Sequence, residues 1–218
     1  MADGMVMSRQ DFPGGDIAGA AQDNLSSDTL SAARAFLPGL QTTLRQPVHC
    51  LGVGLHSGCV VNLTLKPAAP GTGLRFHRTD VAPEKGWVEA RWNTVSDTTL
   101  CTTVGNRHGV SVATVEHLVA ALAATGVDNV IVELDAPEPP AMDGSAAPFL
   151  FLIECAGVVQ QAAERAMLHI RKEVRVEDGG KYAMFLPDRA AMMDVTIDFE
   201  SPAIGRQQIA LELSAMRF

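Results

Sequence analysis

Apolar and polar residues alternate along several short stretches in the middle of the chain. The clearest stretch runs from Val60 to Lys66 and ends at Pro67, which cannot donate a ladder hydrogen bond. Leu74–Arg78 and Gly86–Ala90 are similar stretches, and Val130–Leu134 is a further apolar one. Such alternation is typical of half-buried strands, so we expect four strands here.

A helical period begins after the first three of these strands. The apolar positions recur at i, i+3, i+4 and i+7, and they are Val115, Leu118, Val119 and Leu122. Thr114 is expected to cap this helix, and Gly126 is expected to end it because glycine takes a positive φ at no steric cost. The opposite face of this helix carries alanines where a solvated helix would usually carry charged residues: Ala120, Ala121 and Ala124. This predicts that a substrate or a second domain packs closely there.

A second helix follows a proline-rich loop at residues 136–140 and a turn at Asp143. Ser145 is expected to cap it, Pro148 is tolerated in its first turn, and Gly157 is expected to end it. Strand, helix, strand, helix in this order predicts an α+β fold. Residues 41–165 would form a two-layer α/β sandwich as the first domain.

The pattern changes from Met167 onward. Residues 169–176 and 181–185 alternate around a turn, and two more strands are expected at 195–199 and 209–213. Residues 166–218 therefore predict the start of a second domain of similar type, with strands but no helix to cover them. Residues 1–40 show no sustained periodicity, so we expect a disordered extension there, although residues 30–37 could form a short helix.

Composition narrows the function classes. The net charge of −8 argues against a nucleic-acid-binding protein, and any anionic substrate would need local positive groups. No segment reaches the roughly 18 consecutive apolar residues of a membrane span. The cysteines are widely scattered and predict reduced thiols of a cytoplasmic protein: Cys50, Cys59, Cys101 and Cys155.

Candidate chemistry lies at the start of the first helix, in Glu116 and His117. The helix dipole there favours an ionised carboxylate and disfavours an imidazolium, so His117 would stay neutral and able to bind a metal. A metal-bound water beside a carboxylate is the arrangement of catalytic groups typical of a zinc hydrolase. The alternative is an ordinary amphipathic helix whose Glu116 and His117 face water.

Four motifs resemble those of the UDP-3-O-acyl-N-acetylglucosamine deacetylase family in order and spacing. They are GVGLHSG at 52–58, TTLCT at 98–102, TVEHL at 114–118 and MDGS at 142–145. The resemblance runs from about Gln41 to the last residue and includes SPAIGRQ at 201–207. That family carries out the committed step of lipid A (lipopolysaccharide) biosynthesis in Gram-negative bacteria.

The resemblance implies that Glu116 is the general base and that His117 is one of three protein ligands of a catalytic Zn²⁺. Such ligands would also accept Fe²⁺. The reaction would remove acetate from UDP-3-O-acyl-N-acetylglucosamine, with the proton of the attacking water passing to Glu116.

The resemblance implies that three further motif positions and a lysine just past the later hairpin turn line the substrate site: His56, Leu100, Cys101 and Lys181. His56 could instead hold backbone carbonyls of its own loop, and Cys101 could be a small buried thiol. Lys181, which the family would place at the nucleotide-sugar end of the substrate, could be simply solvated. Asp143 could brace the active site or merely form its Asp-Gly turn.

The chain departs from the family pattern beyond Phe218. The family's other two zinc ligands, a histidine and an aspartate, come from the second domain, and an Arg-Thr-Phe-Gly-Phe segment would be expected soon after this residue. One histidine cannot hold zinc as three protein ligands do. We therefore expect a truncated deacetylase that is inactive alone. The alternatives are a non-catalytic protein that binds a nucleotide sugar or a partner, and half of a split enzyme completed by a separate chain.

Overall fold

A computed structural model describes residues 39–213, so the expectations for residues 1–38, including the short helix at 30–37, lie outside the described residues. The fold is mixed α and β, which confirms the predicted α+β class. Its elements are β1 (Leu40–Leu44), β2 (Val48–Val53), β3 (Val60–Pro67), β4 (Leu74–Arg78), β5 (Trp87–Glu89), η2 (Trp92–Thr94), β6 (Val95–Asp97), β7 (Thr103–Gly105), β8 (Ser111–Val112), α1 (Glu116–Ala124), β9 (Val130–Leu134), α2 (Ala147–Ala156), β10 (Val158–Glu164), β11 (Val174–Asp178), β12 (Lys181–Phe185), β13 (Met192–Asp198) and β14 (Arg206–Glu212).

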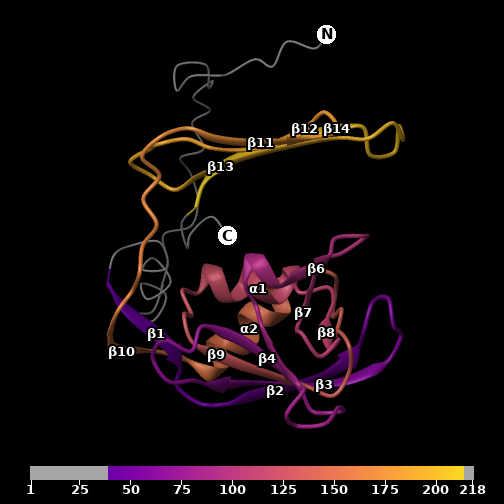
Figure 1. Ribbon diagram of the computed structural model, residues 1–218, viewed down its shortest axis with the longest axis vertical. Coiled ribbons are helices and arrows are strands. Elements are labelled where there is room, and N and C mark those ends of the chain that lie inside the picture. Colours follow the sequence, from indigo (N-terminus) through magenta and orange to yellow (C-terminus); the bar gives the residue numbers. More distant parts are fainter. Residues whose placement is uncertain (1–38, 214–218) are drawn as a thin grey trace, which may run out of the picture.

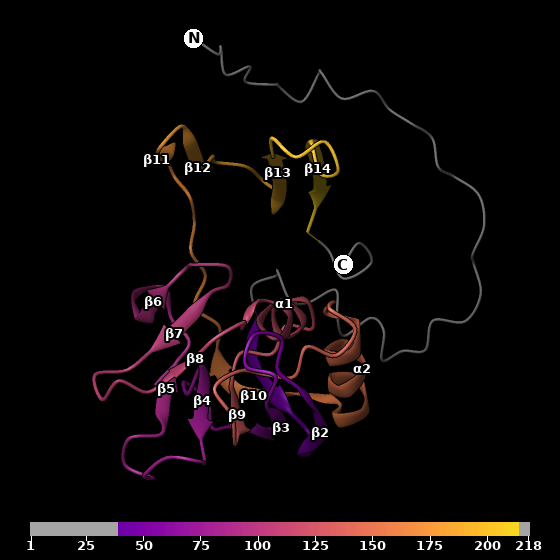
Figure 2. The ribbon, with the colours of Figure 1, turned by 90° about the vertical axis from the view of Figure 1, so that its right-hand side faces the viewer.

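A five-stranded sheet in the order β2-β3-β9-β4-β5 forms the base of the structure. Its strands are antiparallel except for β4 and β9, which run parallel. Both helices lie on the same face of this sheet (Figures 1 and 2). The four strands predicted from alternation are all present, and the predicted second layer of helices covers them.

The core lies between the sheet and the helices. In β3, Val61, Leu63 and Leu65 are fully buried, whereas the intervening Asn62 is exposed, as the period of two requires. These strand residues pack in one cluster with Phe149 of α2 and with residues of α1. Burying each such side chain contributes roughly 1.5–3 kcal/mol, so this layer contact holds the helices in place.

The start of α1 differs from the prediction. The N-cap residue is Val115, no side chain caps the helix, and Thr114 takes a left-handed φ of 54°. The Thr114 hydroxyl donates to the Glu138 carboxylate instead of capping a backbone N–H. The predicted end is confirmed, because Gly126 follows the C-cap with a φ of 70°.

The alanine face of α1 also corrects the prediction. Ala121 is fully buried and Ala124 is only 3% exposed. Ala121 belongs to the same core cluster as Phe149 and Ile153 of α2. Ala121 and Ala124 are therefore covered by the rest of the described chain and are not open to a substrate or a second domain, whereas Ala120 is half-buried.

The second helix nearly matches the expectation. Ala146 is the N-cap residue, one position after the predicted Ser145. The Ser145 hydroxyl still accepts a hydrogen bond from the Ala147 N–H at 3.1 Å. Pro148 lies in the first turn and Gly157 ends the helix, as predicted.

Two strands that the sequence pattern did not predict, β1 and β10, pair antiparallel beside the main sheet. Polar residues in β1 are buried through tertiary hydrogen bonds. The Thr42 N–H donates to Asp128 at 2.8 Å, and the Thr43 hydroxyl donates to the Asn129 carbonyl at 2.7 Å. The segment therefore has no alternating pattern that would have revealed it.

The last four strands form two separate hairpins, β11–β12 and β13–β14. Both views show them apart from the helices and the main sheet (Figures 1 and 2). Nearly all their residues are exposed, including Val176 at 64% and Phe185 at 62%. The strands predicted at 181–185, 195–199 and 209–213 are confirmed within a few residues, whereas the strand predicted at 169–176 begins only at Val174. No helix covers these strands within residues 39–213, while the assignment of 166–218 to a second domain stays a prediction. None of the helices in the described part of the chain is long and apolar enough to cross a bilayer.

Candidate functional site

Glu116 and His117 form the first turn of α1, which stands on the main sheet through its buried face. The Glu116 carboxylate accepts a hydrogen bond from the Thr102 N–H. Partial burial raises the pKa of Glu116. This effect is outweighed by hydrogen bonds from the N–H groups of Glu116 and Thr102, from the Thr102 side chain, and by the nearby His117, so the pKa lies below its usual range. The carboxylate is thus ionised at neutral pH, as expected at a helix start.

Asp143 is the second carboxylate close to His117. Its pKa is lowered mainly by hydrogen bonds from the Ser145 side chain and backbone, and the charge of His117 lowers it further. The Asp143 carboxylate accepts from the Ser145 N–H at 2.9 Å and from its hydroxyl at 2.8 Å. The turn reading of Asp143 is thereby confirmed, and its role in bracing the active site stays a prediction.

The 98–102 loop contains Leu100 and Cys101, and it contacts Glu116 through the Thr102 N–H. Leu100 is 88% exposed and has a φ of 65°. Cys101 is half-buried, with its Sγ 3.8 Å from the Thr103 hydroxyl. The structure thus brings this loop against Glu116, with an apolar side chain projecting into solvent.

Backbone strain gathers in the motifs. Among residues 39–213, the non-glycine residues with a positive φ are Leu100, Thr114 and Met142. Each lies in a different one of the four motifs that carry the family resemblance. A non-glycine residue held at positive φ costs free energy, and such residues cluster at functional sites. Their coincidence with the motifs favours a site shared by these three loops.

His56 lies in the loop that follows the buried Gly54, in which residues 55–58 are exposed, and its N–H donates to a carboxylate oxygen of Glu138 at 2.9 Å. The loop is thereby connected to Thr114, which binds the other oxygen of the same carboxylate at 2.9 Å. Sequence reasoning missed Glu138. It stands among prolines in a loop, a position without periodicity, and no local signal distinguishes it from a solvated glutamate.

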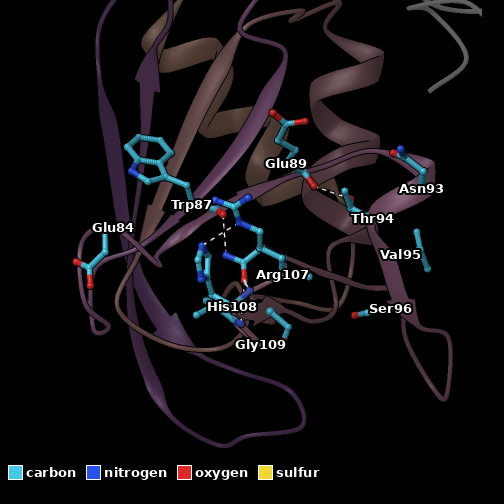
Figure 3. A pocket seen from close by; sticks show the side chains of 14 residues that line it. Glu84, Trp87, Glu89, Asn93, Thr94, Val95, Ser96, Arg107, His108 and Gly109 are labelled. Atoms are coloured by element: carbon cyan, nitrogen blue, oxygen red, sulfur yellow. Dashed lines mark hydrogen bonds between the residues drawn. The ribbon is translucent and has the colours of Figure 1, made fainter.

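Lys181 does not lie near Glu116 and His117. It is the exposed first residue of β12, in a hairpin that both views show apart from α1 (Figures 1 and 2). Nor does a groove elsewhere on the structure contain a predicted site residue. That groove of about 890 Å³ is lined by residues of β5 to β8, including Trp87, Arg107 and His108 (Figure 3).

The described residues do not complete a metal site. In the range 39–213, no group of three or more His, Cys, Asp or Glu side chains is arranged to hold a metal ion. His117 is therefore a single candidate ligand within this range, whereas zinc in proteins requires three or four protein ligands. The four cysteines, all within the described residues, form no disulfide.

Comparison with known proteins decides the family. The sequence pattern described as "LpxC: UDP-3-O-acyl N-acetylglycosamine deacetylase" matches residues 41–218. The chain belongs to this family. The resemblance drawn from the four motifs is thereby confirmed, and the family is one of deacetylases.

Several relatives share about half of their aligned residues with the chain. The UDP-3-O-acyl-N-acetylglucosamine deacetylase of Haemophilus influenzae (strain PittEE) is 49% identical over 180 residues, which cover 82% of this chain and 59% of the relative. The enzymes of the same name from Pasteurella multocida (strain Pm70) and Shewanella violacea are 50% and 46% identical. The chain spans less than two thirds of the length of these relatives.

Proposed function

We propose that this protein takes part in removing the acetyl group of a UDP-3-O-acyl-N-acetylglucosamine, a step of lipid A biosynthesis. The observation that carries the proposal is the convergence of three strained motif loops around an ionised Glu116 and His117. The relatives named as deacetylases of this substrate support the same reaction.

Glu116 is the proposed general base. Its carboxylate stands at the exposed end of α1 and is held by the Thr102 N–H. In the reaction, water attacks the acetamide carbonyl carbon and gives its proton to this carboxylate. The C–N bond then breaks, the amine takes up a proton, and acetate leaves. A positioned base of this kind accelerates hydrolysis by about 10²–10⁴-fold.

His117 is the proposed ligand of a Zn²⁺ ion, for which Fe²⁺ could substitute. A bound metal of this kind polarises a carbonyl and acidifies water. Because no group of three or more His, Cys, Asp or Glu side chains in residues 39–213 is arranged to hold a metal ion, the remaining ligands are proposed to come from outside this range. His56, Leu100 and Cys101 are proposed substrate contacts on the neighbouring loops, and Lys181 is proposed to contact the nucleotide-sugar end.

A split enzyme is the second candidate, and the uncovered hairpins favour it. Their exposed apolar side chains, among them Tyr182 and Phe199, require a cover that residues 39–213 do not provide. A separate chain could supply both this cover and the missing ligands. Free thiols suit a reducing compartment, so we place the protein in the cytoplasm.

The test uses residues 41–218 fused to the part of the Haemophilus influenzae relative that has no counterpart here. We expect the fused protein to bind one zinc ion and to release acetate from the substrate, whereas the 218-residue chain does neither. His117→Ala should abolish zinc binding in the fused protein. Zinc retained at full stoichiometry in that variant would contradict the assignment of His117. Zinc-dependent turnover by the chain alone would contradict the claim that ligands are missing.

A further inference from the structure

Glu138 is the buried carboxylate that the proposed reaction does not use. It lies in the proline-rich loop between β9 and α2 and is only 1% exposed. No other Asp or Glu in residues 39–213 is buried. A buried carboxylate is costly unless hydrogen bonds satisfy it, so its partners explain why it is tolerated there.

Both oxygens of this carboxylate accept hydrogen bonds. One accepts from the N–H groups of His56 at 2.9 Å and Ser57 at 2.6 Å. The other accepts from the Thr114 hydroxyl at 2.9 Å. Hydrogen bonds to a charged acceptor are the stronger kind, so one side chain joins two loops that lie more than 50 residues apart in the chain.

The Thr114 side of this bridge leads directly to α1. Thr114 has a φ of 54°, an unfavourable conformation for a β-branched residue. The preceding Ala113 N–H donates to the Pro137 carbonyl at 2.9 Å, and the following Val115 N–H donates to the Thr102 carbonyl at 3.4 Å. The strained turn is therefore fixed from both sides, and Glu116 is the next residue after it.

The His56 side of the bridge is equally confined. A Cβ added at Gly54 would lie 2.3 Å from a Glu138 carboxylate oxygen, so only glycine lets the loop close around the carboxylate. The Gly54 N–H donates to the Cys59 carbonyl at 2.9 Å and closes the loop. His56 thus stands on a loop whose position depends on Glu138.

We propose that Glu138 is a positioning residue, which sets the His56 loop against the strained turn before α1 and so places Glu116 and His117. Its effect on catalysis rests on the proposed function. The bridge between the two loops does not rest on the proposed function, and it can be measured without any enzymatic turnover.

The first test uses the full chain with Thr114→Val, which removes the hydroxyl at nearly constant shape, and Thr114→Ser, which keeps it. We record the imidazole NMR signals of His117 and His56 at fixed pH, with His108 as the internal reference. Thr114→Val should move the His117 and His56 signals and leave those of His108 in place, and Thr114→Ser should restore them. Unchanged His117 signals in Thr114→Val, or equal shifts in both variants, would overturn the proposal.

A second variant covers the case in which Thr114→Val fails to fold. Glu138→Gln keeps the volume of the side chain but removes its charge. Amide hydrogen exchange at His56 and Ser57 should then accelerate about tenfold. The reason is that their N–H groups would donate to a neutral amide oxygen, which forms weaker hydrogen bonds than a charged carboxylate. Exchange rates equal to those of the unaltered chain would overturn the bridge.

The fused protein separates this inference from the proposed function. There, Thr114→Val should lower kcat with KM unchanged, and Thr114→Ser should retain kcat. A lowered kcat/KM with unchanged kcat would speak against a positioning role. If the unaltered fused protein has no activity, the proposed function fails, while the NMR comparison still decides the bridge.

Discussion

Gly54→Ala is the substitution whose cost follows most directly from the structure. The added Cβ would lie 2.3 Å from a Glu138 oxygen, 2.5 Å from the Ser57 hydroxyl and 2.6 Å from the Glu138 Cγ. Such distances are far inside van der Waals contact, so the loop or the carboxylate must move. Either movement breaks the two hydrogen bonds of 2.9 and 2.6 Å from the His56 and Ser57 N–H groups.

The magnitude follows from these two bonds. Each hydrogen bond to a charged group contributes about 1.5–3 kcal/mol, and the carboxylate would stay buried without them. We expect a loss of about 3 kcal/mol in the free energy of unfolding. For a chain of this size, that loss lowers Tm by roughly 6–12 °C.

Urea unfolding followed by tryptophan fluorescence measures this loss, since Trp87 lies in β5 of the main sheet and its ring stacks on His77. Gly39→Ala is the matched control, because a Cβ there would have no neighbour within 4 Å and its φ is not in the left-handed region. A Gly54→Ala variant as stable as Gly39→Ala would refute the reasoning about this loop.

Three further outcomes are expected. Phe149→Ala, at a side chain 1% exposed, should cost about 3–5 kcal/mol in urea unfolding, whereas Phe151→Ala, at a side chain 65% exposed, should cost little, and equal costs would show that α2 does not pack as described. Burial raises the pKa of Glu138, but its hydrogen bonds lower it more, so the folded pKa lies below its unfolded value. The stability that the Glu138 charge contributes is therefore fully present above the unfolded pKa of about 4.3 and is lost as pH falls through the folded pKa. The stability difference between the chain and Glu138→Gln should shrink over that acid range, and a difference independent of pH would exclude this linkage. In the fused protein, chelation of the metal should abolish acetate release and added zinc should restore it, while activity that survives chelation would argue against a metal enzyme.

Periodicity predicted the elements whose burial is regular along the chain. In β3 the alternation of Val61, Leu63 and Leu65 with outward residues is visible in the sequence and is what the sheet requires. The α1 helix was likewise predicted from its apolar spacing, and its end from Gly126. These features depend on local pattern alone, which is why the sequence was sufficient for them.

Features that depend on distant partners could not be read in the same way. Thr114 has the side chain of a good helix cap, but Glu138, 24 residues later, takes its hydroxyl. Thr42 and Thr43 are buried only because Asp128 and Asn129 meet them in space. In each case a tertiary hydrogen bond overrides the local preference of the residue.

The candidate site was predictable in part. The resemblance selected Glu116 and His117, and the structure puts the 98–102 loop and Asp143 beside them. It does not bring Lys181 there, and the buried role of Glu138 had no signal in the sequence. A lone glutamate between prolines is equally compatible with solvent exposure, so only the fold reveals its partners.

The most direct measurement of the central claim is the rate of acetate release by the fused protein carrying Glu116→Gln. Glu154→Gln, at an exposed glutamate of α2, is the control. With Glu116 as the general base, kcat should fall by about 10²–10⁴-fold at unchanged zinc content, and the control should match the unaltered protein. A Glu116→Gln protein that retains its zinc and turns over as fast as the control would contradict the account.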